Sequence, residues 1–230
     1  MTDALVVRSI PYGESDVVAT LLTEREGKVA TLVRGARKGS RRVAGALEPM
    51  HTISATYEDK GTDLVTLKEA TVVRPRTALL GKLDSIEAAG ALLRWARHVF
   101  PPKTREPAAF QTLLEALDAL DAGGIDARAE LASAGLRLLS DVGWGLELAQ
   151  CVKCGRKCPD DASAQLDPSR GGIVCRACGG ARLLLAAPVR RAALAALARD
   201  PRANALCAPH EKALVAIVEA AMAAHAGFEA

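Results

Sequence analysis

Residues 5–33 read LVVRSIPYGESDVVATLLTEREGKVATLV. This stretch contains three short runs rich in aliphatic and β-branched residues, and each run is bounded by a polar turn. The runs occupy residues 5–10, 17–23 and 29–33. The turns contain Pro11-Tyr12-Gly13 and Glu26-Gly27, which are residue types that favour chain reversal. Runs of this length and composition are typical of β-strands.

The strand pattern continues to about residue 78. Two more runs lie at residues 52–57 and 64–73, after turn signals at 35–45 and 59–61. Five short strands in under 80 residues indicate a small β-barrel, and we expect the five-stranded OB-fold. A small sandwich or an SH3-like barrel remains open, because the number of strands does not fix their topology.

The periodicity becomes helical after Pro75. Apolar residues follow i, i+3, i+4 spacing from Leu79 to Ala96, and Pro101-Pro102 ends that stretch. Further helices are predicted at residues 106–122, 126–142, 188–198 and 209–226. The sequence therefore predicts an α+β chain with an OB-fold barrel at residues 1–78 and a helical domain at residues 79–230. A cysteine-rich segment at residues 149–182 is inserted in the helical domain.

The inserted segment holds two Cys-x2-Cys pairs, Cys151/Cys154 and Cys175/Cys178, with 20 residues between them. Two such pairs bring four thiolates into tetrahedral arrangement around one ion. The chain has no secretory signal pattern and no apolar run near the ~20 residues of a membrane helix, so we expect a cytoplasmic protein. Thiols stay reduced there, which favours metal over disulfides. We expect one structural Zn²⁺ per chain.

Two other interpretations of these cysteines fit less well. The segment Lys153–Arg170 is too polar for a core of reduced thiols. A catalytic zinc keeps an open position and usually mixes histidine or carboxylate ligands with cysteine. Cys158, four residues after Cys154, is an alternative ligand, and Cys207 is expected to be a small core residue.

One loop concentrates positive charge, although the chain as a whole carries only +3. Residues 34–42 read RGARKGSRR, in which five of nine side chains are cationic and none is acidic. Gly35 and Gly39 allow the backbone to approach phosphates closely. A basic run alone is as typical of a solvated loop as of a binding site. The barrel context favours contact with a nucleic-acid backbone.

Aromatic residues are scarce in the barrel region, which has only Tyr12 and Tyr57. Strong single-strand binders stack bases on several aromatic rings. We therefore expect electrostatic, sequence-blind binding, with a log K against log salt slope of about −3.5 if five charges contact phosphates. The chain has no Walker loop, dinucleotide fingerprint or Gly-x-Ser-x-Gly motif, so we expect no enzyme activity.

Four stretches together resemble a known family. They are ALVVRSIPYGESD at residues 4–16, residues 23–39 with VRGAR at 33–37, LEP at 47–49, and LRLLSDVGW at 136–144, which leads into CVKCG at 151–155. In this order they are similar to the RecO family of bacterial recombination mediators. The likeness spans most of the chain, whereas the cysteine motif by itself is generic.

The resemblance implies an OB-fold domain, a helical domain and an embedded zinc finger. It also implies binding to single- and double-stranded DNA, strand annealing, pairing with RecR, and recognition of the C-terminal tail of single-strand-binding protein so that RecA loads. We expect a chain that is monomeric alone, does not bind membranes and associates with the nucleoid in the cytoplasm. Carried over by position, the DNA-contact candidates are Arg34, Arg37, Lys38, Arg41 and Arg42, with Arg8, Arg74 and Arg76 as weaker candidates at barrel edges.

Three other functions stay open at this point. A metalloenzyme acting on nucleic acid requires an open metal position or a paired acid and base. A zinc-ribbon transcription or translation accessory factor requires a basic or aromatic ribbon. A structural adaptor requires no nucleic-acid contact.

For the tail of single-strand-binding protein, a basic rim beside leucines near Arg94, Arg97 or Arg137 suits an acidic segment that ends in Phe.

Overall fold

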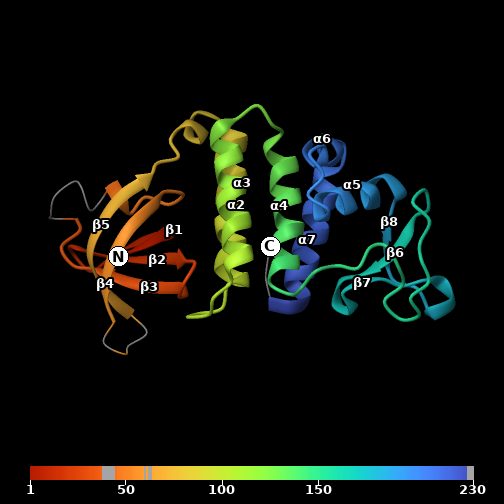
Figure 1. Cartoon of the computed structure of the whole chain (residues 1–230), viewed down its shortest axis with the longest axis horizontal. Helices are drawn as coiled ribbons and strands as arrows, with labels where there is room; N and C mark the ends of the chain where they lie inside the picture. Colours follow the sequence, from red (N-terminus) through yellow and green to blue (C-terminus); the bar gives the residue numbers. More distant parts are fainter. Residues whose placement is uncertain (38–44, 60, 62–63, 227–230) are drawn as a thin grey trace. The chain divides into compact units, whose positions relative to one another are not determined.

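The computed structural model describes residues 1–37, 45–59, 61 and 64–226 (Figure 1). It contains two compact units, Met1–Ala122 and Gly123–Ala230. Within the described ranges, no helix is long and apolar enough to cross a membrane.

The first unit begins with five strands that close into a barrel, as predicted. The strands are β1 (Thr2–Tyr12), β2 (Asp16–Thr23), β3 (Gly27–Val33), β4 (Thr52–Glu58) and β5 (Leu64–Arg74). Their order around the barrel is β1-β2-β3-β5-β4; β3 and β5 are parallel, and every other pair is antiparallel (Figure 1). This closed order confirms the OB-fold and excludes the open sandwich.

The barrel core follows from the alternation of side chains along each strand. In β3, buried and partly exposed residues alternate without a break. Since successive side chains point to opposite faces of a strand, Val29, Thr31 and Val33 point inward while Lys28 and Leu32 point outward. The interior contains Val6, Leu21, Ile53 and Leu67 among other buried residues.

Two long helices complete the first unit, α2 (Leu83–Val99) and α3 (Pro107–Ala122), after the short turn η1 (Ala78–Gly81). Their buried side chains include Trp95 and Leu117. Hydrogen bonds connect the helices to the rest of the unit; Leu79 N, for example, donates to Asp121 Oδ1 at 3.0 Å. The compact unit therefore ends at Ala122, whereas the sequence-based boundary at residue 78 follows the change from strands to helices.

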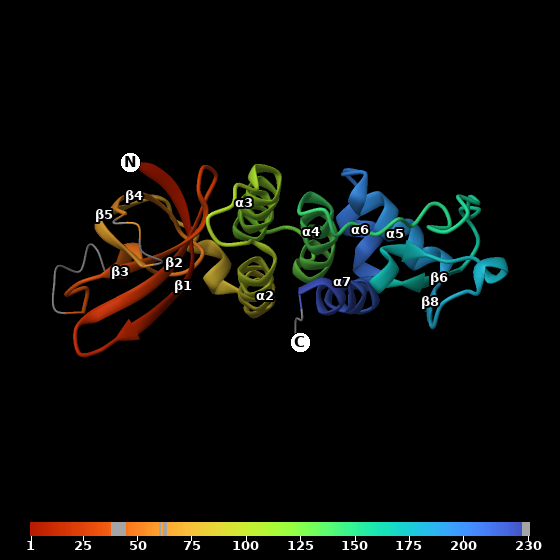
Figure 2. The ribbon, with the colours of Figure 1, turned by 90° about the horizontal axis from the view of Figure 1, so that it is seen from below.

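The second unit is helical and carries a small sheet. Its helices are α4 (Ala127–Asp141), α5 (Ala187–Leu197), α6 (Ala203–Cys207) and α7 (Glu211–Ala226). Figure 2 shows α4 beside α7, against which it packs. Between α4 and α5 the chain forms β6 (Ala164–Asp167), β7 (Gly172–Ile173) and β8 (Leu183–Leu185), in the order β7-β6-β8. The sequence did not predict α6, because five residues are too few to show helical periodicity.

Candidate metal centre and nucleic-acid interface

The two Cys-x2-Cys pairs come together at one point beside the small sheet. The sulfur atoms of Cys151, Cys154, Cys175 and Cys178 all lie within 4.8 Å of one another. Four sulfurs bound tetrahedrally at the Zn–S distance of ~2.3 Å lie about 3.8 Å apart. The Cys154 and Cys175 sulfurs are 3.7 Å apart, so the arrangement has the dimensions of a four-cysteine metal site.

Glycines after each pair shape the turns that present the sulfurs. Gly155 has φ +69 and donates its N–H to the Cys151 carbonyl at 2.8 Å. Gly179 and Gly180 have φ +100 and +63, and Gly180 N donates to the Cys175 carbonyl at 3.1 Å. These left-handed conformations favour glycine, which explains why it follows both pairs. The Cys175 N–H also donates to the Cys151 sulfur at 3.4 Å, which holds the two pairs together.

The pKa values of the clustered thiols favour binding of a cation. The N–H of Cys175 is the main reason that the pKa of Cys151 falls to about 6. The pKa of Cys178 rises to about 12, chiefly because its thiol hydrogen-bonds to the Cys154 and Cys175 sulfurs. Thiols at this spacing do not all ionise beside one another unless a positive ion offsets their repulsion. The donor set therefore fits a divalent, sulfur-binding metal ion.

The two remaining cysteines lie outside this cluster. The Cys158 sulfur lies 4.0 Å from the carbonyl of Ala162, and Cys158 is not a member of the metal-ligating group. Cys207 is fully buried, as predicted; its sulfur lies 3.6 Å from the carbonyl of Ala192, and burial raises its pKa to about 11. Among the described residues, the four-cysteine group is the only one of its kind.

A buried arginine that sequence reasoning missed braces the metal segment. Arg190 lies on α5 and has no exposed surface. Its guanidinium donates to the carbonyls of Leu148 at 2.9 Å and Ala162 at 3.3 Å, and also to that of Pro159. These bonds attach the irregular chain around the cysteines to the helical core. Nothing in the local sequence distinguishes Arg190 from its exposed neighbour Arg191.

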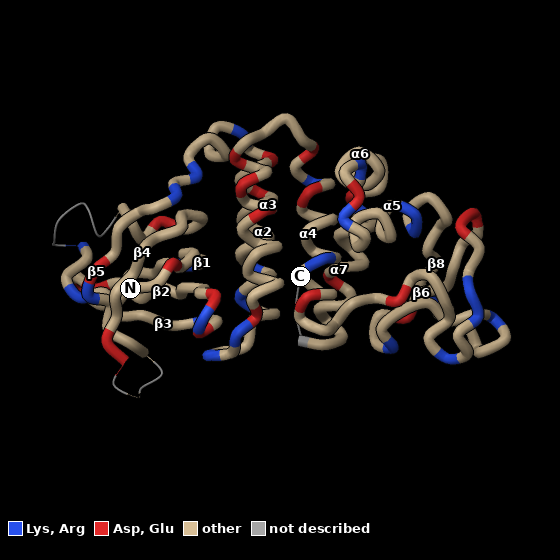
Figure 3. Tube along the Cα trace, viewed as in Figure 1, with Lys and Arg blue, Asp and Glu red and all other residues tan. Residues whose placement is uncertain are grey.

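The predicted basic loop follows β3. Arg34 and Arg37 are exposed, and the turn that carries them is hydrogen-bonded to the β1–β2 turn. Figure 3 marks the lysines and arginines of the described chain in blue along the Cα trace. Gly35 N donates to Asp16 Oδ1 at 2.8 Å, and Arg37 N donates to the Ser15 carbonyl at 2.9 Å. The other predicted contacts, Lys38, Arg41 and Arg42, lie outside the described residues.

Comparison with known families covers both units. The family model described as Recombination protein O N terminal matches residues 1–76, and the one described as Recombination protein O C terminal matches residues 81–229. The chain belongs to the RecO family. This agrees with the resemblance carried by the four sequence stretches.

Curated relatives in the RecO family are similar over most of their length. A protein named DNA repair protein RecO from Anaeromyxobacter sp. (strain Fw109-5) is 38% identical over 197 residues, which is 85% of this chain and 76% of the relative. One of the same name from Anaeromyxobacter dehalogenans (strain 2CP-C) is 36% identical over 229 residues, 98% of this chain and 85% of the relative. The Myxococcus xanthus (strain DK1622) protein is 34% identical over 191 residues, 81% and 76% of the two chains.

The barrel-edge arginines of this RecO-family chain differ in exposure. Arg76, a weaker DNA-contact candidate in the sequence, has almost no surface to offer DNA, because its side chain is 1% exposed and its Nε lies 2.7 Å from Asp118 Oδ1. Arg74 is 61% exposed and pairs with the same carboxylate at 2.8 Å. Arg8 is exposed on β1. An isolated sequence gives no signal for the burial of Arg76, because its acidic partner is 42 residues away.

A second group of cations in the RecO-family barrel was not predicted to bind DNA. Lys28 on β3 and Arg97 on α2 meet at the barrel surface, where Lys28 Nζ donates to the Arg97 carbonyl at 2.6 Å. The sequence pattern predicts that Lys28 points outward and that Arg97 lies near the end of a helix. It does not predict that the two residues lie side by side, since 69 residues separate them.

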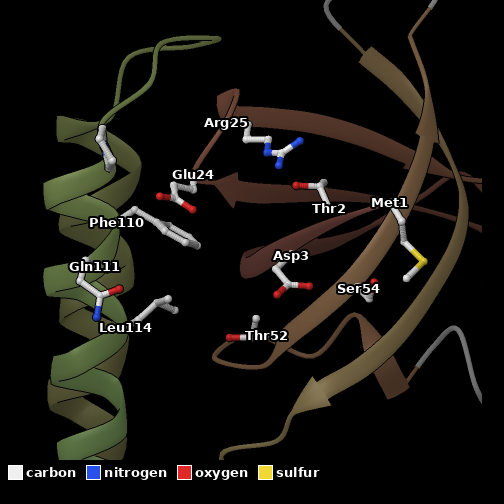
Figure 4. Close-up of a pocket in the computed structure, with 11 residues that line it drawn as sticks. Met1, Thr2, Asp3, Glu24, Arg25, Thr52, Ser54, Phe110, Gln111 and Leu114 are labelled. Carbon is white, nitrogen blue, oxygen red and sulfur yellow. The ribbon is translucent and has the colours of Figure 1, made fainter.

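One pocket of the first unit, of about 600 Å³, is lined by side chains of both charges and is unfavourable for an anion. Figure 4 shows Asp3, Glu24 and Arg25 on the barrel side of the pocket, and Phe110 and Leu114 on α3. Carboxylates repel phosphate, so this side of the RecO-family barrel is unfavourable for a nucleic-acid backbone.

Proposed function

We propose that this chain is a DNA-binding recombination mediator that anneals complementary strands. With RecR, it helps to load RecA on DNA coated with single-strand-binding protein. The observation that carries this proposal is the pair of exposed cations, Arg34 and Arg37, at the end of β3 in a closed OB-fold barrel of a RecO-family chain. The names of the relatives, all DNA repair protein RecO, support a role in repair.

The barrel surface suits contact with phosphates rather than with bases. Tyr12 is 58% exposed, whereas Tyr57 is partly buried and its hydroxyl is fully covered. With one well-exposed aromatic ring among the described barrel residues, base stacking contributes little. Contacts with the backbone leave the base edges free to pair with a second strand. An annealing protein needs this property.

We also propose that the four-cysteine site holds one structural Zn²⁺. All four donors are thiols, and this is the ligand set of closed structural zinc sites rather than of catalytic ones. The ion supplies no chemistry to a substrate in this proposal. It stabilises the segment that includes β6, β7 and β8, whose strands are only 4, 2 and 3 residues long.

RecR and the tail of single-strand-binding protein remain proposed partners, and a cytoplasmic location belongs to the same proposal. The basic residues suggested for the tail belong to different units, with Arg94 and Arg97 on α2 and Arg137 on α4. Arg137 pairs with Glu130 at 2.8 Å, which neutralises its charge. Arg137 is therefore a weaker candidate for an acidic tail than the sequence indicated.

The test replaces four cations of the basic loop together, as Arg37→Glu/Lys38→Glu/Arg41→Glu/Arg42→Glu. We expect filter binding to single-stranded DNA to fall by at least about 100-fold, because four phosphate contacts are lost and repulsion is added. Annealing of strands coated with single-strand-binding protein should fall with it. The charge-conserving control Arg37→Lys/Arg41→Lys/Arg42→Lys should keep most of the affinity. Unchanged DNA binding by the folded glutamate variant would refute the proposal.

A further inference from the structure

Lys28, Arg97 and Arg8 form a cationic cluster at the end of β3 opposite to Arg34. Lys28 donates from Nζ to the Arg97 carbonyl at 2.6 Å, and Arg97 donates from Nη1 to the Val7 carbonyl at 3.4 Å. These two contacts hold the last turn of α2 against β1 and β3. Arg8 lies one residue beyond Val7 and is exposed. The three cations therefore belong to one place on the surface of the first unit.

In the part of the chain that the structure describes, no acidic side chain neutralises the charges of the cluster. Burial lowers the pKa of Arg97, and the positive charges of Arg8 and Arg94 lower it further. Burial and the charge of Arg97 likewise lower the pKa of Lys28. Among the described residues, no acidic side chain forms a salt bridge with Lys28, Arg97 or Arg8. Like charges held together in this way attract an anion.

A pocket beside the cluster has room for such an anion. Its volume is about 510 Å³, and it is lined by Thr20, Lys28, Ala30, Arg97, Pro102 and Lys103. Thr20 and Ala30 are paired across β2 and β3, so the floor of the pocket is the outer face of the barrel. The small side chains let a phosphate group approach the cations, and the Thr20 hydroxyl adds a donor.

The cluster and the start of the predicted basic loop lie at the two ends of one continuous strip on the outer face of the barrel. Lys28 and Arg34 are six residues apart, which is about 20 Å along a strand. Register places Arg8 beside Thr20, and Ile10 beside Val18, on the same outer face. This is the face of β1, β2 and β3, and the strand 2–3 face of OB-folds commonly binds oligonucleotides.

We propose that Lys28, Arg97 and Arg8 form a second phosphate-binding site for DNA. A single strand held at Arg34 and Arg37 crosses the outer face of β1, β2 and β3 and places a further phosphate beside this cluster. The inference rests on the proposed DNA binding. It adds the route that the strand takes across the barrel and a second place where a phosphate is bound. It also assigns a binding role to α2, which the sequence placed in a separate helical domain.

A nucleic-acid strand fits these features better than an acidic peptide. Phosphates recur along a strand, so two cationic ends about 20 Å apart can both be occupied by one molecule. An acidic peptide with an apolar end needs a deep apolar pocket next to its cations. The pocket at Lys28 has no large apolar side chain in its lining, and its apolar surface comes from Ala30, Pro102 and the hydrocarbon parts of Thr20 and the cations.

The test uses the full chain with Lys28→Gln/Arg97→Gln and a labelled 20-nucleotide oligothymidylate. We expect the dissociation constant to rise about tenfold and the slope of log K against log salt to become less steep by about 1.4, which corresponds to two phosphate contacts. The matched control Lys68→Gln/Lys82→Gln removes the same charge from exposed positions on β5 and before α2. It should leave the slope unchanged. The charge-conserving variant Lys28→Arg/Arg97→Lys should bind almost as the wild type does.

Because Lys28 and Arg97 also hold α2 in place, Arg8→Gln is a second variant that removes only an exposed side chain. It should make the slope less steep by about 0.7. Wild-type slope and affinity in both variants would overturn the second site, while the glutamate variant of the loop still reports on DNA binding itself. Loss of binding to a labelled polyglutamate peptide with unchanged DNA affinity would assign the cluster to an acidic peptide and would also overturn the proposal.

Discussion

Arg76 and Asp118 connect the end of the barrel to α3 across 42 residues of sequence. The Arg76 Nε donates to Asp118 Oδ1 at 2.7 Å, and its Nη1 donates to the Met50 carbonyl at 2.7 Å and to Thr52 Oγ1 at 3.0 Å. Arg74, two residues earlier, reaches the same carboxylate from the exposed side. One acid thus joins a buried and an exposed arginine, and this helps to make barrel, α2 and α3 one compact unit.

Loss of this carboxylate should destabilise the first unit strongly. In Asp118→Ala, the buried Arg76 guanidinium loses the acidic partner that it has among the described residues, and removing one partner of a buried ion pair costs about 3–5 kcal/mol. In Arg74→Gln, only an exposed pair is lost, so the free energy of unfolding should fall by at most about 1 kcal/mol. Urea denaturation followed by circular dichroism measures both. Equal effects of the two substitutions would mean that Arg76 does not depend on Asp118.

Removal of the metal should loosen the second unit and spare the first. With Cys154→Ser, or with a chelator, we expect bound zinc to fall from about one ion per chain toward zero. Amide exchange should speed up in β6, β7 and β8, because their segment loses the metal ion that connects the two cysteine pairs. Oligothymidylate binding should persist, because the proposed contacts lie in the first unit. Complete loss of DNA binding while the barrel keeps its exchange protection would show that the metal segment itself holds DNA.

DNA affinity should rise as the pH falls toward the pKa of His98. Burial lowers this pKa below its ordinary value of 6.5, and the charges of Arg97, Lys28 and Arg94 lower it further, so His98 is neutral at pH 7. A bound phosphate offsets the repulsion and raises the pKa, so binding takes up a proton and is favoured by acid. Between pH 7.5 and 5.5 we expect affinity to increase about threefold more in the wild type than in His98→Gln. Identical pH profiles would place the phosphate away from the cluster.

Gly27 should tolerate no side chain. Its φ is +65, and a Cβ there would lie 1.8 Å from the Thr104 carbonyl oxygen, which belongs to the segment between α2 and α3. Gly27→Ala therefore combines backbone strain with a clash against backbone, and should destabilise the first unit by about 3 kcal/mol. Gly13→Ala is the matched control, since φ is +58 but nothing lies within 4 Å of the Cβ. It should cost about 1 kcal/mol in the same thermal melts. Equal melting temperatures would contradict the close approach of Thr104.

Much of the local structure was predictable, because its causes are local. The five barrel strands begin and end within a few residues of their predicted limits, and β1 differs most because Thr2, Asp3 and Ala4 also pair with β4. The helices α3, α4 and α7 were predicted for the same reason, since an amphipathic pattern is written in consecutive residues. The four-cysteine site was also predictable, because the spacing of each Cys-x2-Cys pair and the glycine turn after it are local features of the sequence.

The sequence by itself determined the five barrel strands, the long helices, the four cysteines that meet, and the family of the chain, but not the short elements β6, β7, β8 and α6. Only the tertiary structure decided the roles of its cations. It buried Arg76 and Arg190, left Arg8 exposed, and brought Lys28 to Arg97. The physical reason is that strand and helix patterns depend on neighbours along the chain. The burial and charge environment of a side chain depend on residues tens of positions away, which only packing brings close.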